Sequence, residues 1–280
     1  MTQQHGESTT LVIGGTGKTG KRVVDRLKAA GLPVRVGSRS AIPAFDWDLE
    51  QTWDTALDDV DAIYVTYSPD LAMPGASDAI QRLVDLAKAR GVRRLVLLSG
   101  RGEAEAEACE AIVQRSGLEW TVVRASWFQQ NFSEGAFTDM VLSGTITLPA
   151  GDVPEPFVDV DDIADIVFAA LTQSEHHGEV YEVTGPRLMT FDDIAADLSE
   201  ATGRTITFQS VPHRAFVDGV AASGAPEDVV WMLDYLFATV LDGRNATLTD
   251  GVQRALGREP RDFKDYARDA AARGAWNEAA

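Results

Sequence analysis

The sequence predicts an α/β fold: a doubly wound, Rossmann-type parallel sheet with a smaller C-terminal α+β lobe. Three observations indicate it. Short apolar segments alternate with helical segments along the first half of the chain, a glycine-rich turn joins the first such pair, and the alternation breaks down after about residue 125. Strand–helix alternation is typical of βαβ units, whose parallel strands are covered by helices on both faces.

Each element is predicted from its periodicity and from the residues that flank it. Apolar, β-branched segments predict strands, and apolar residues at helical spacing predict helices. Gly31 and Pro33 separate the first helix from the second strand. Strands are expected at 9–13, 34–36, 61–66, 94–99, 120–124, 180–183 and 206–208, and helices at 18–30, 79–90, 103–116, 161–171 and 190–202.

The change of pattern predicts two parts of unequal size. We expect a dinucleotide-binding domain over residues 1–150 and a smaller lobe on the substrate side over residues 151–280. The two are expected to pack so closely that they behave as one domain, with the option that a strand of the lobe returns to the main sheet. A chain of 280 residues with 45% hydrophobic residues is large enough for a substantial core.

Composition and charge argue against several classes of function. With 25 basic against 43 acidic residues the chain carries a formal net charge of −18, which repels nucleic-acid phosphates and anionic lipid. We therefore expect a small-molecule acceptor as partner, with no nucleic acid and no membrane, and a monomer or homodimer. The first residues lack the apolar core of a signal peptide, and no apolar segment reaches the roughly 18 residues of a membrane helix. A cytoplasmic location is expected.

The cysteine and histidine content argues against thiol chemistry and against metal binding. Cys109, the single cysteine, falls within a predicted helix and is expected to be a small buried side chain rather than a nucleophile. His176 and His177 are adjacent in a polar turn, where both are expected to be solvated. No cysteine or carboxylate spacing around them suits a metal ion. We therefore predict no metal site.

A glycine-rich turn follows the first predicted strand and opens the first predicted helix. Residues 14–20 read Gly-Gly-Thr-Gly-Lys-Thr-Gly, with the spacing G-x-x-G-x-x-G. Glycines at this spacing allow a tight turn, close approach of the backbone to a pyrophosphate and close helix–strand contact, and the helix N-terminus favours the anion. The turn predicts dinucleotide binding through Gly14, Thr16, Gly17, Lys18, Thr19 and Gly20. It is not a P-loop, which requires glycine where the chain has Val12.

The segment after the second predicted strand favours NADP(H) over NAD(H). Sites for NAD usually place an acidic residue there, whereas this chain has Ser38, Arg39 and Ser40. The planar guanidinium of Arg39 suits a 2′-phosphate, and the serines offer hydroxyl donors. Asp46 can accept from the adenine amino group with Trp47 beside the ring, unless Trp47 is a partly buried residue of the sheet edge. The predicted cofactor site is completed by Ser38, Arg39, Asp46, Trp47, Thr66 and Ser99.

Many Rossmann reductases donate a proton from a tyrosine that has a lysine four residues later on the same helix. None of the five tyrosines of this chain has a lysine at that spacing. The remaining candidates follow strand ends. Ser99 can donate a hydrogen bond to a substrate or cap the next turn, and Tyr67 is a candidate proton donor. Glu110 is expected to anchor its helix rather than to act as an acid.

Further segments have a specific order and spacing. They are 110–112, 116–121, Arg124, 127–132, 156–160, 162–164, 181–186, 249–252, 257–258 and Pro260. Together with the glycine-rich turn and Arg39, they resemble the NmrA-like group of atypical short-chain dehydrogenases. The resemblance implies a Rossmann domain with a smaller C-terminal lobe, and a place near the nicotinamide and the substrate for residues 127–132. We assign to the substrate side Trp127, Phe128, Asn131, Phe132 and Phe157.

Two functions are compatible with this resemblance. The group includes NAD(P)H-dependent quinone reductases and non-catalytic regulators that sense NADP(H), and both lack the tyrosine–lysine pair. We favour an enzyme that transfers hydride from NADPH to a small acceptor such as a quinone, ahead of a ketone or an imine. The aromatic residues of the second lobe support it, because a flat acceptor can stack on those that are not ordinary core. The alternative is a sensor that acts through a protein partner.

Overall fold

The computed structural model describes residues 9–135 and 137–277. The chain divides into two compact units, and both are discontinuous in sequence. Unit 1 comprises Met1–Arg124, Ile163–Glu182 and Arg254–Leu256, and unit 2 comprises Ala125–Asp162, Val183–Gln253 and Gly257–Ala280. The units therefore differ from the expected division into 1–150 and 151–280, because the chain leaves unit 1 long before residue 150 and returns to it twice.

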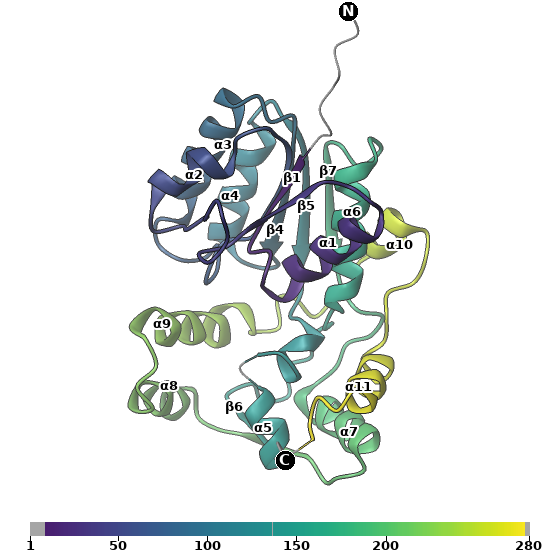
Figure 1. Ribbon diagram of the computed structural model, residues 1–280. Helices are drawn as coiled ribbons and strands as arrows, with labels where there is room; N and C mark the ends of the chain where they lie inside the picture. Colours follow the sequence, from purple (N-terminus) through teal and green to yellow (C-terminus); the bar gives the residue numbers. More distant parts are fainter. Residues whose placement is uncertain (1–8, 136, 278–280) are drawn as a thin grey trace, which may run out of the picture. The chain divides into compact units, whose positions relative to one another are not determined.

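Unit 1 is built on a sheet with the strand order β2-β1-β3-β4-β5-β7 (Figure 1). The strands are β1 (Thr9–Ile13), β2 (Val34–Gly37), β3 (Val60–Val65), β4 (Arg94–Gly100), β5 (Glu119–Ala125) and β7 (Glu179–Val183). Strand β1 pairs in parallel with both β2 and β3, so that Val12 lies opposite Val36 and Tyr64. The predicted Rossmann-type sheet is confirmed, and β7 is the strand that returns to it from later in the chain.

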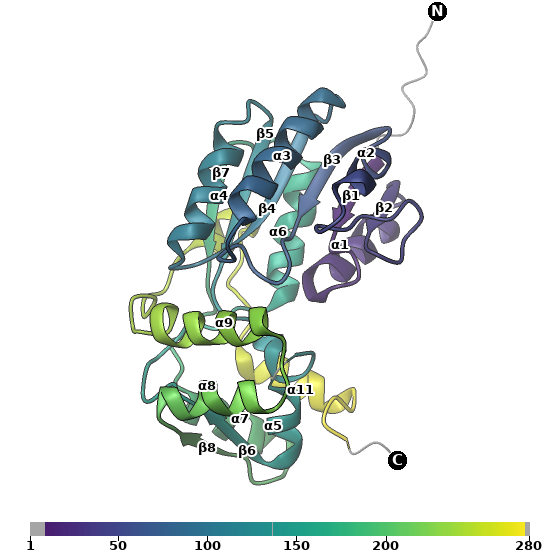
Figure 2. The same ribbon diagram turned by 90° about the vertical axis from the view of Figure 1, so that its left-hand side faces the viewer.

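Helices cover both faces of this sheet. They are α1 (Lys18–Ala29), α2 (Trp53–Ala56), α3 (Ala76–Ala89), α4 (Ala104–Gln114) and α6 (Val160–Thr172), and a 3₁₀ turn (Glu50–Thr52) precedes α2. Helices α3 and α4 lie on one face, and α1 and α6 lie on the other (Figure 2). On the second face, Arg26 Nε of α1 donates to Asp165 Oδ1 of α6 over 2.7 Å. The strands are apolar throughout because both of their faces are buried.

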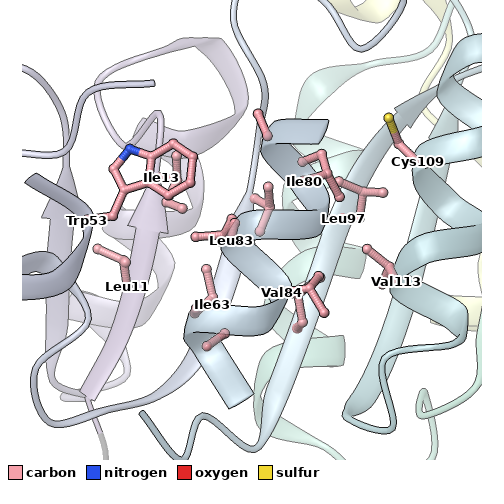
Figure 3. Packing of buried hydrophobic residues seen from close by; sticks show 14 of the residues in the cluster. Leu11, Ile13, Trp53, Ile63, Ile80, Leu83, Val84, Leu97, Cys109 and Val113 are labelled. Carbon is pink, nitrogen blue, oxygen red and sulfur yellow. The ribbon is translucent and has the colours of Figure 1, made fainter. Parts of the chain in front are cut away.

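Every second residue of the central strands points into the core beneath α3 and α4. Leu11, Ile63 and Leu97 point from neighbouring strands toward this core, where they meet helix residues (Figure 3). Trp53 closes it at the side of α2 and is 2% exposed. Cys109 of α4 is fully buried in the same cluster, and burial raises the pKa of its thiol to about 11. The expectation that Cys109 is a small core side chain is confirmed.

Unit 2 contains a two-stranded parallel sheet, short helices and an aromatic core. Strand β6 (Thr145–Leu148) pairs with β8 (Thr207–Ser210). The helices are α5 (Thr138–Ser143), α7 (Phe191–Thr202), α8 (His213–Ala222), α9 (Glu227–Tyr235), α10 (Gly251–Leu256), which extends into unit 1, and α11 (Phe263–Ala272), with a 3₁₀ turn at Gln129–Phe132 and a π-helical turn at Leu236–Val240. The ring of Phe132 packs against four other phenylalanine rings of this core.

The sequence predicted the longer elements and missed the shorter ones. Helix α3 begins at Ala76 rather than at residue 79, because Gly75 adopts the left-handed conformation that turns the chain into the helix. Helix α7 opens at Thr190, whose side chain accepts from the backbone N–H of Asp193 in a reciprocal capping box. Elements α2, α5, β6 and α8 to α11 were not expected, because each is short or is stabilised mainly by packing within its unit.

Candidate functional site

The glycine-rich turn between β1 and α1 has the geometry that its sequence predicted. Gly14 has a φ of +71°, and an added Cβ there would lie 2.1 Å from Thr66 Oγ1. The hydroxyl of Thr66 donates to the Ile13 carbonyl oxygen over 3.1 Å, which holds the end of β3 against the turn. The Gly17 N–H then donates to the Gly14 carbonyl oxygen over 2.9 Å and closes the turn. The Thr66 side chain therefore occupies the space that a side chain at position 14 would need.

The backbone of α1 at Gly20 packs directly against the backbone of this turn. An added Cβ at Gly20 would lie 2.1 Å from the Gly14 carbonyl oxygen and 2.9 Å from Gly15 Cα. Real Cβ atoms are not found this close to backbone atoms, so only glycine fits at position 20. The close approach packs the first turn of α1 against the glycine-rich turn that follows β1.

The N-terminus of α1 suits a pyrophosphate group. Its N-cap is Gly17, which has no side chain to cap the helix, and the first turn contains no acidic residue. The first N–H groups of a helix have no acceptor within it, and the helix dipole adds positive charge there. Gly17 and Thr16 are exposed, whereas the buried Thr19 hydroxyl accepts from the Tyr64 hydroxyl over 3.0 Å. The backbone N–H of Thr19 can therefore donate to a phosphate, while its hydroxyl is bound to Tyr64 in the core.

The loop after β2 carries the residues expected to select the cofactor. Arg39 is exposed, and none of the other residues in the described ranges pairs with its guanidinium or hydrogen-bonds to it. Ser38 is half-buried, and its carbonyl oxygen accepts from the backbone N–H groups of Ala41 and Phe45, which fixes the loop. The Ser38 and Ser40 hydroxyl oxygens lie 3.4 Å apart. A cation beside two hydroxyls fits a phosphate monoester.

Trp47 belongs to an aromatic cluster at the edge of the core. Its ring contacts those of Phe45, Trp53 and Tyr67, with a centroid distance of 4.8 Å to Tyr67. Its indole N–H donates to the Thr66 carbonyl oxygen over 3.1 Å. Trp47 is half-buried, so it is part of the sheet edge and still presents part of its surface.

The neighbouring Asp46 has a structural role of its own. Its carbonyl oxygen accepts from the Trp53 indole N–H over 2.6 Å, and its carboxylate Oδ1 accepts from the backbone N–H of Asp48 over 3.1 Å. These bonds shape the segment that leads to α2. One carboxylate oxygen is thus engaged locally, and a role toward adenine stays a prediction.

Ser99 is the donor in a buried hydrogen bond and is 4% exposed. Its hydroxyl donates to Glu110 Oε1 over 2.6 Å. Glu110, 2% exposed, also accepts from the Arg124 guanidinium at both of its oxygens, with Nε to Oε1 at 2.9 Å. The expectation that Glu110 is an anchor is confirmed. While Ser99 donates to Glu110, its single proton is not available to a substrate.

The same network continues across the sheet. Glu182 of β7 accepts from Arg101 Nε over 2.6 Å at one carboxylate oxygen, and its other oxygen lies 3.6 Å from Arg124 Nη1. Hydrogen bonding to Glu110 raises the pKa of Arg124 above its ordinary value. Charged side chains that follow β4, end β5 and lie on β7 are therefore tied together on one side of unit 1.

Tyr67, the other predicted catalytic residue, is poorly suited to donate a proton. It is half-buried against Trp47, and burial together with the nearby Asp48 charge raises the pKa of its phenol. Catalytic tyrosines need the opposite shift, which the missing lysine would supply. Tyr67 is thus better described as part of the aromatic cluster.

Two acidic residues that the sequence did not single out lie close together beside the end of β4. Glu103 occupies the N-cap position of α4 without a side-chain capping bond and is 5% exposed, and its carboxyl lies near that of Asp70, which follows β3. An added Cβ at Gly100 would lie 2.2 Å from Glu103 Oε1, so the carboxyl group rests directly on the Gly100 backbone. Burial and the Asp70 charge raise the pKa of Glu103 far above that of an ordinary carboxyl.

The predicted substrate-side residues lie in unit 2 and fall into two classes. Phe132 and Phe157 are 0% and 1% exposed and pack in the aromatic core, so they are core residues rather than substrate contacts. Trp127, Phe128 and Asn131 are half-buried and retain some exposed surface. The rings of Trp127 and Phe237 lie 5.2 Å apart. Of the five predicted residues, Trp127, Phe128 and Asn131 therefore keep exposed surface, and their role toward a substrate stays a prediction.

The histidine turn differs from the expectation. His176 is 4% exposed, and its Nδ1 hydrogen-bonds with the Tyr181 hydroxyl over 2.8 Å, because the turn folds back onto β7. Burial lowers the pKa of His176. His177 is exposed, as expected. Within the described ranges, no group of three or more His, Cys, Asp or Glu side chains could hold a metal ion, and no helix is long and apolar enough to cross a bilayer.

Comparison with known proteins identifies relatives along nearly the whole chain. A model of the NmrA-like family matches residues 6–267. An agroclavine dehydrogenase from Claviceps fusiformis is 33% identical over 93% of this chain and 96% of its own length. An NAD(P)H azoreductase from Xenophilus azovorans is 30% identical over 94% and 98%, respectively. The NADPH-dependent quinone oxidoreductase of Escherichia coli, complexed with NADPH, shares the fold with a TM-score of 0.78 and 19% identity, over 93% of this chain and 99% of that one.

Substitution of Gly17 by valine is expected to abolish dinucleotide binding and to leave the fold intact. An added Cβ at Gly17 would meet the Gly14 carbonyl oxygen at 3.2 Å, a contact that small shifts relieve, but the side chain would stand where the pyrophosphate meets the helix. Calorimetric titration with NADPH measures binding, and thermal unfolding measures the fold. Gly20→Val is the contrasting variant, because its Cβ would collide with backbone and should prevent folding. An unchanged NADPH affinity in Gly17→Val contradicts the assigned site.

Removal of the Glu110 carboxylate is expected to destabilise unit 1. Glu110→Ala leaves the Ser99 hydroxyl and part of the Arg124 guanidinium without an acceptor, and breaking a buried pair costs about 3–5 kcal/mol. Urea denaturation measures the loss. Glu107→Ala is the matched control, because Glu107 is 55% exposed and lies 3.7 Å from the same arginine. Its expected cost is about 0–1 kcal/mol. Equal losses in the two variants would show that burial does not govern this network.

Proposed function

The chain belongs to the NmrA-like family and is an NAD(P)H-dependent reductase, and from this premise we propose that it uses NADPH to reduce a small conjugated acceptor such as a quinone. The observation that carries the proposal is the N-terminus of α1, which follows the glycine-rich turn after β1, has no side-chain cap and has no acidic residue in its first turn. A negatively charged pyrophosphate is the ligand that this arrangement favours.

Each part of the cofactor would have its own partner in unit 1. The first turn of α1 would hold the pyrophosphate, and Arg39 would pair with the 2′-phosphate with help from Ser38. Arg39 supports a preference for NADPH, because its guanidinium has no competing partner among the described side chains. Trp47 would lie beside the adenine, and Thr66 would hold the turn in shape through its bond to Ile13. When bound, the dinucleotide supplies the hydride.

The residues of this chain bind and orient the reactants rather than form a covalent bond with them. Cys109 is buried and its thiol is protonated at neutral pH, so it does not act as a nucleophile. Ser99 and Arg124 are committed to Glu110 and keep the ends of their strands rigid. Hydride transfer between bound partners requires close positioning above all, and a rigid strand edge provides it.

The acceptor we favour is a quinone, because its conjugated carbonyl groups accept hydride readily. A second candidate is an azo bond, which a 30% identical relative named as an azoreductase supports. The half-buried Trp127 and Phe128 of unit 2 are the aromatic residues suited to a flat acceptor. We do not favour a sensor without turnover, since five relatives at 30% identity or more are named as dehydrogenases, synthases or an azoreductase.

Turnover is tested by following NADPH oxidation at its near-ultraviolet absorbance with purified protein. The panel contains quinones, azo dyes, ketones and cyclic imines. We expect turnover with quinones, and turnover with azo dyes alone would favour the second candidate. Tight NADPH binding without turnover of any acceptor would overturn the proposed reaction and favour the sensor.

Substitution of Arg39 by alanine is expected to weaken NADPH binding by roughly 10- to 100-fold, which corresponds to the about 1.5–3 kcal/mol of a hydrogen bond to a charged group. NADH binding should be unaffected, because NADH lacks the 2′-phosphate. Titration of nucleotide fluorescence measures both affinities. Arg115→Ala is the control, since it removes the same charge from an exposed position on another loop. Equal weakening of both cofactors would remove Arg39 from the phosphate site.

A further inference from the structure

The proposed reaction lacks a proton source among the residues considered so far. Reduction of a quinone to a hydroquinone takes a hydride and one further proton. Ser99 donates its only proton to Glu110, and burial makes the phenol of Tyr67 a weaker acid than usual. The tyrosine–lysine pair of other reductases is absent. Any proton from the protein must therefore come from another group.

Glu103 and Asp70 form a pair of carboxyl groups whose surroundings favour a bound proton. Glu103 Oε2 is buried and receives no hydrogen bond from any N–H or O–H donor in residues 9–135 and 137–277. The Asp70 carboxyl lies nearby, and a buried carboxyl oxygen that has no donor and faces a second acidic group favours the protonated form. Neither carboxyl forms an ion pair with a lysine or arginine of the described chain.

The surroundings of the pair favour the protonated form from every side. Asp70 faces Glu103 from the loop after β3, and the Glu105 carboxylate of α4 adds a second negative charge. Cys109, also on α4, lies near the Asp70 charge and is itself protonated. Glu103 is 5% exposed, whereas Asp70 is half-buried and connects the pair to solvent. A proton on Glu103 is therefore shielded from solvent, and Asp70 offers a route by which it can leave.

The position of the pair is the one where a ligand is expected. Asp70 follows β3, and Glu103 follows β4 and begins α4. Ligands of open α/β sheets bind beyond the carboxyl ends of the strands, and these two residues come from adjacent strands. Gly100, the last residue of β4, supports the Glu103 carboxyl with its backbone and leaves no room for a Cβ. The pair is therefore held rigidly beside a strand end.

We propose that Glu103 and Asp70 are the proton-donating pair of this reductase, with Glu103 storing the proton and Asp70 passing it to the acceptor. This inference rests on the proposed function. The quinone gains two electrons and a proton as hydride from the dinucleotide, and its anionic oxygen takes the second proton from the pair. The products are the hydroquinone and the oxidised dinucleotide, and the pair regains its proton from water through Asp70.

The experiment compares acceptors that differ only in their need for a proton. A quinone requires one, whereas a cationic triarylmethane dye becomes neutral by accepting hydride alone. Glu103→Gln preserves shape but cannot release a proton, and Asp70→Asn removes the relay. Both variants should lower kcat for the quinone by roughly 10²-fold or more relative to kcat for the dye, with the Kd for NADPH unchanged. Glu107→Gln, at a 55% exposed position on the same helix, is the matched control and should change neither rate.

Two pH measurements report the proton directly. In wild type, kcat for the quinone should fall as the pH rises through the pKa of Glu103, which burial and Asp70 raise to about 9, and Glu103→Gln should lack this step. Thermal unfolding without cofactor gives a second readout. The folded chain binds this proton more tightly than the unfolded chain, whose carboxyl titrates near 4.5, so stability is lost between those two values. Glu103→Gln should lose less in Tm across this range than wild type.

Each outcome decides a different claim. Equal slowing of Glu103→Gln with quinone and with dye would assign Glu103 a structural role and overturn the proposal. A quinone rate and pH profile that Glu103→Gln leaves unchanged would also overturn it. If wild type reduces no acceptor, the proposed function fails and proton donation fails with it. The Tm measurement still shows in that case whether Glu103 holds a proton, so the two failures are distinguishable.

Discussion

The approach of α1 to the Gly14 carbonyl oxygen is the contact on which the nucleotide side of unit 1 depends. No Cβ fits at Gly20, and the resulting closeness brings the helix N-terminus to the end of β1. The same closeness lets the Tyr64 hydroxyl of β3 reach Thr19 inside the helix. A steric constraint at one glycine therefore aligns two strands and a helix around a single point, and that point is where the positive end of the helix dipole opens.

Paired and unpaired charged residues lie close together at the ends of β4 and β5, and they have different roles there. At the ends of β4 and β5, Arg101 and Arg124 are neutralised by carboxylates in fixed positions. Beside them, Glu103 and Asp70 lack any cationic partner among the described residues, and burial raises the pKa of Glu103. Paired ions make that edge rigid, while the unpaired acids keep a group that can change its charge. Structural ion pairs and the proposed proton-donating carboxyl pair therefore lie within a few residues of each other along the chain.

The sheet and the glycine turn could be predicted from sequence because their signals are local. Buried parallel strands are continuously apolar, and the spacing of glycines in residues 14–20 has a direct geometric meaning. The contact between Asp70 and Glu103 has no such signal, since it depends on which strands lie side by side. The burial of His176 was missed for the same reason, because Tyr181 covers it only after the turn folds onto β7. Phe132 showed the converse difficulty, since an aromatic residue in a core and one in a binding site look alike in sequence.

The discontinuity of the two units has a consequence for modularity. The chain passes from one unit to the other after Arg124, Asp162, Glu182, Gln253 and Leu256. A fragment ending at residue 150 would lack β7, the edge strand of the main sheet, and α6, which covers one of its faces. Neither unit can therefore be inherited, exchanged or expressed as a single uninterrupted segment. Exchange of either unit between related chains would require several separate segments to be replaced together.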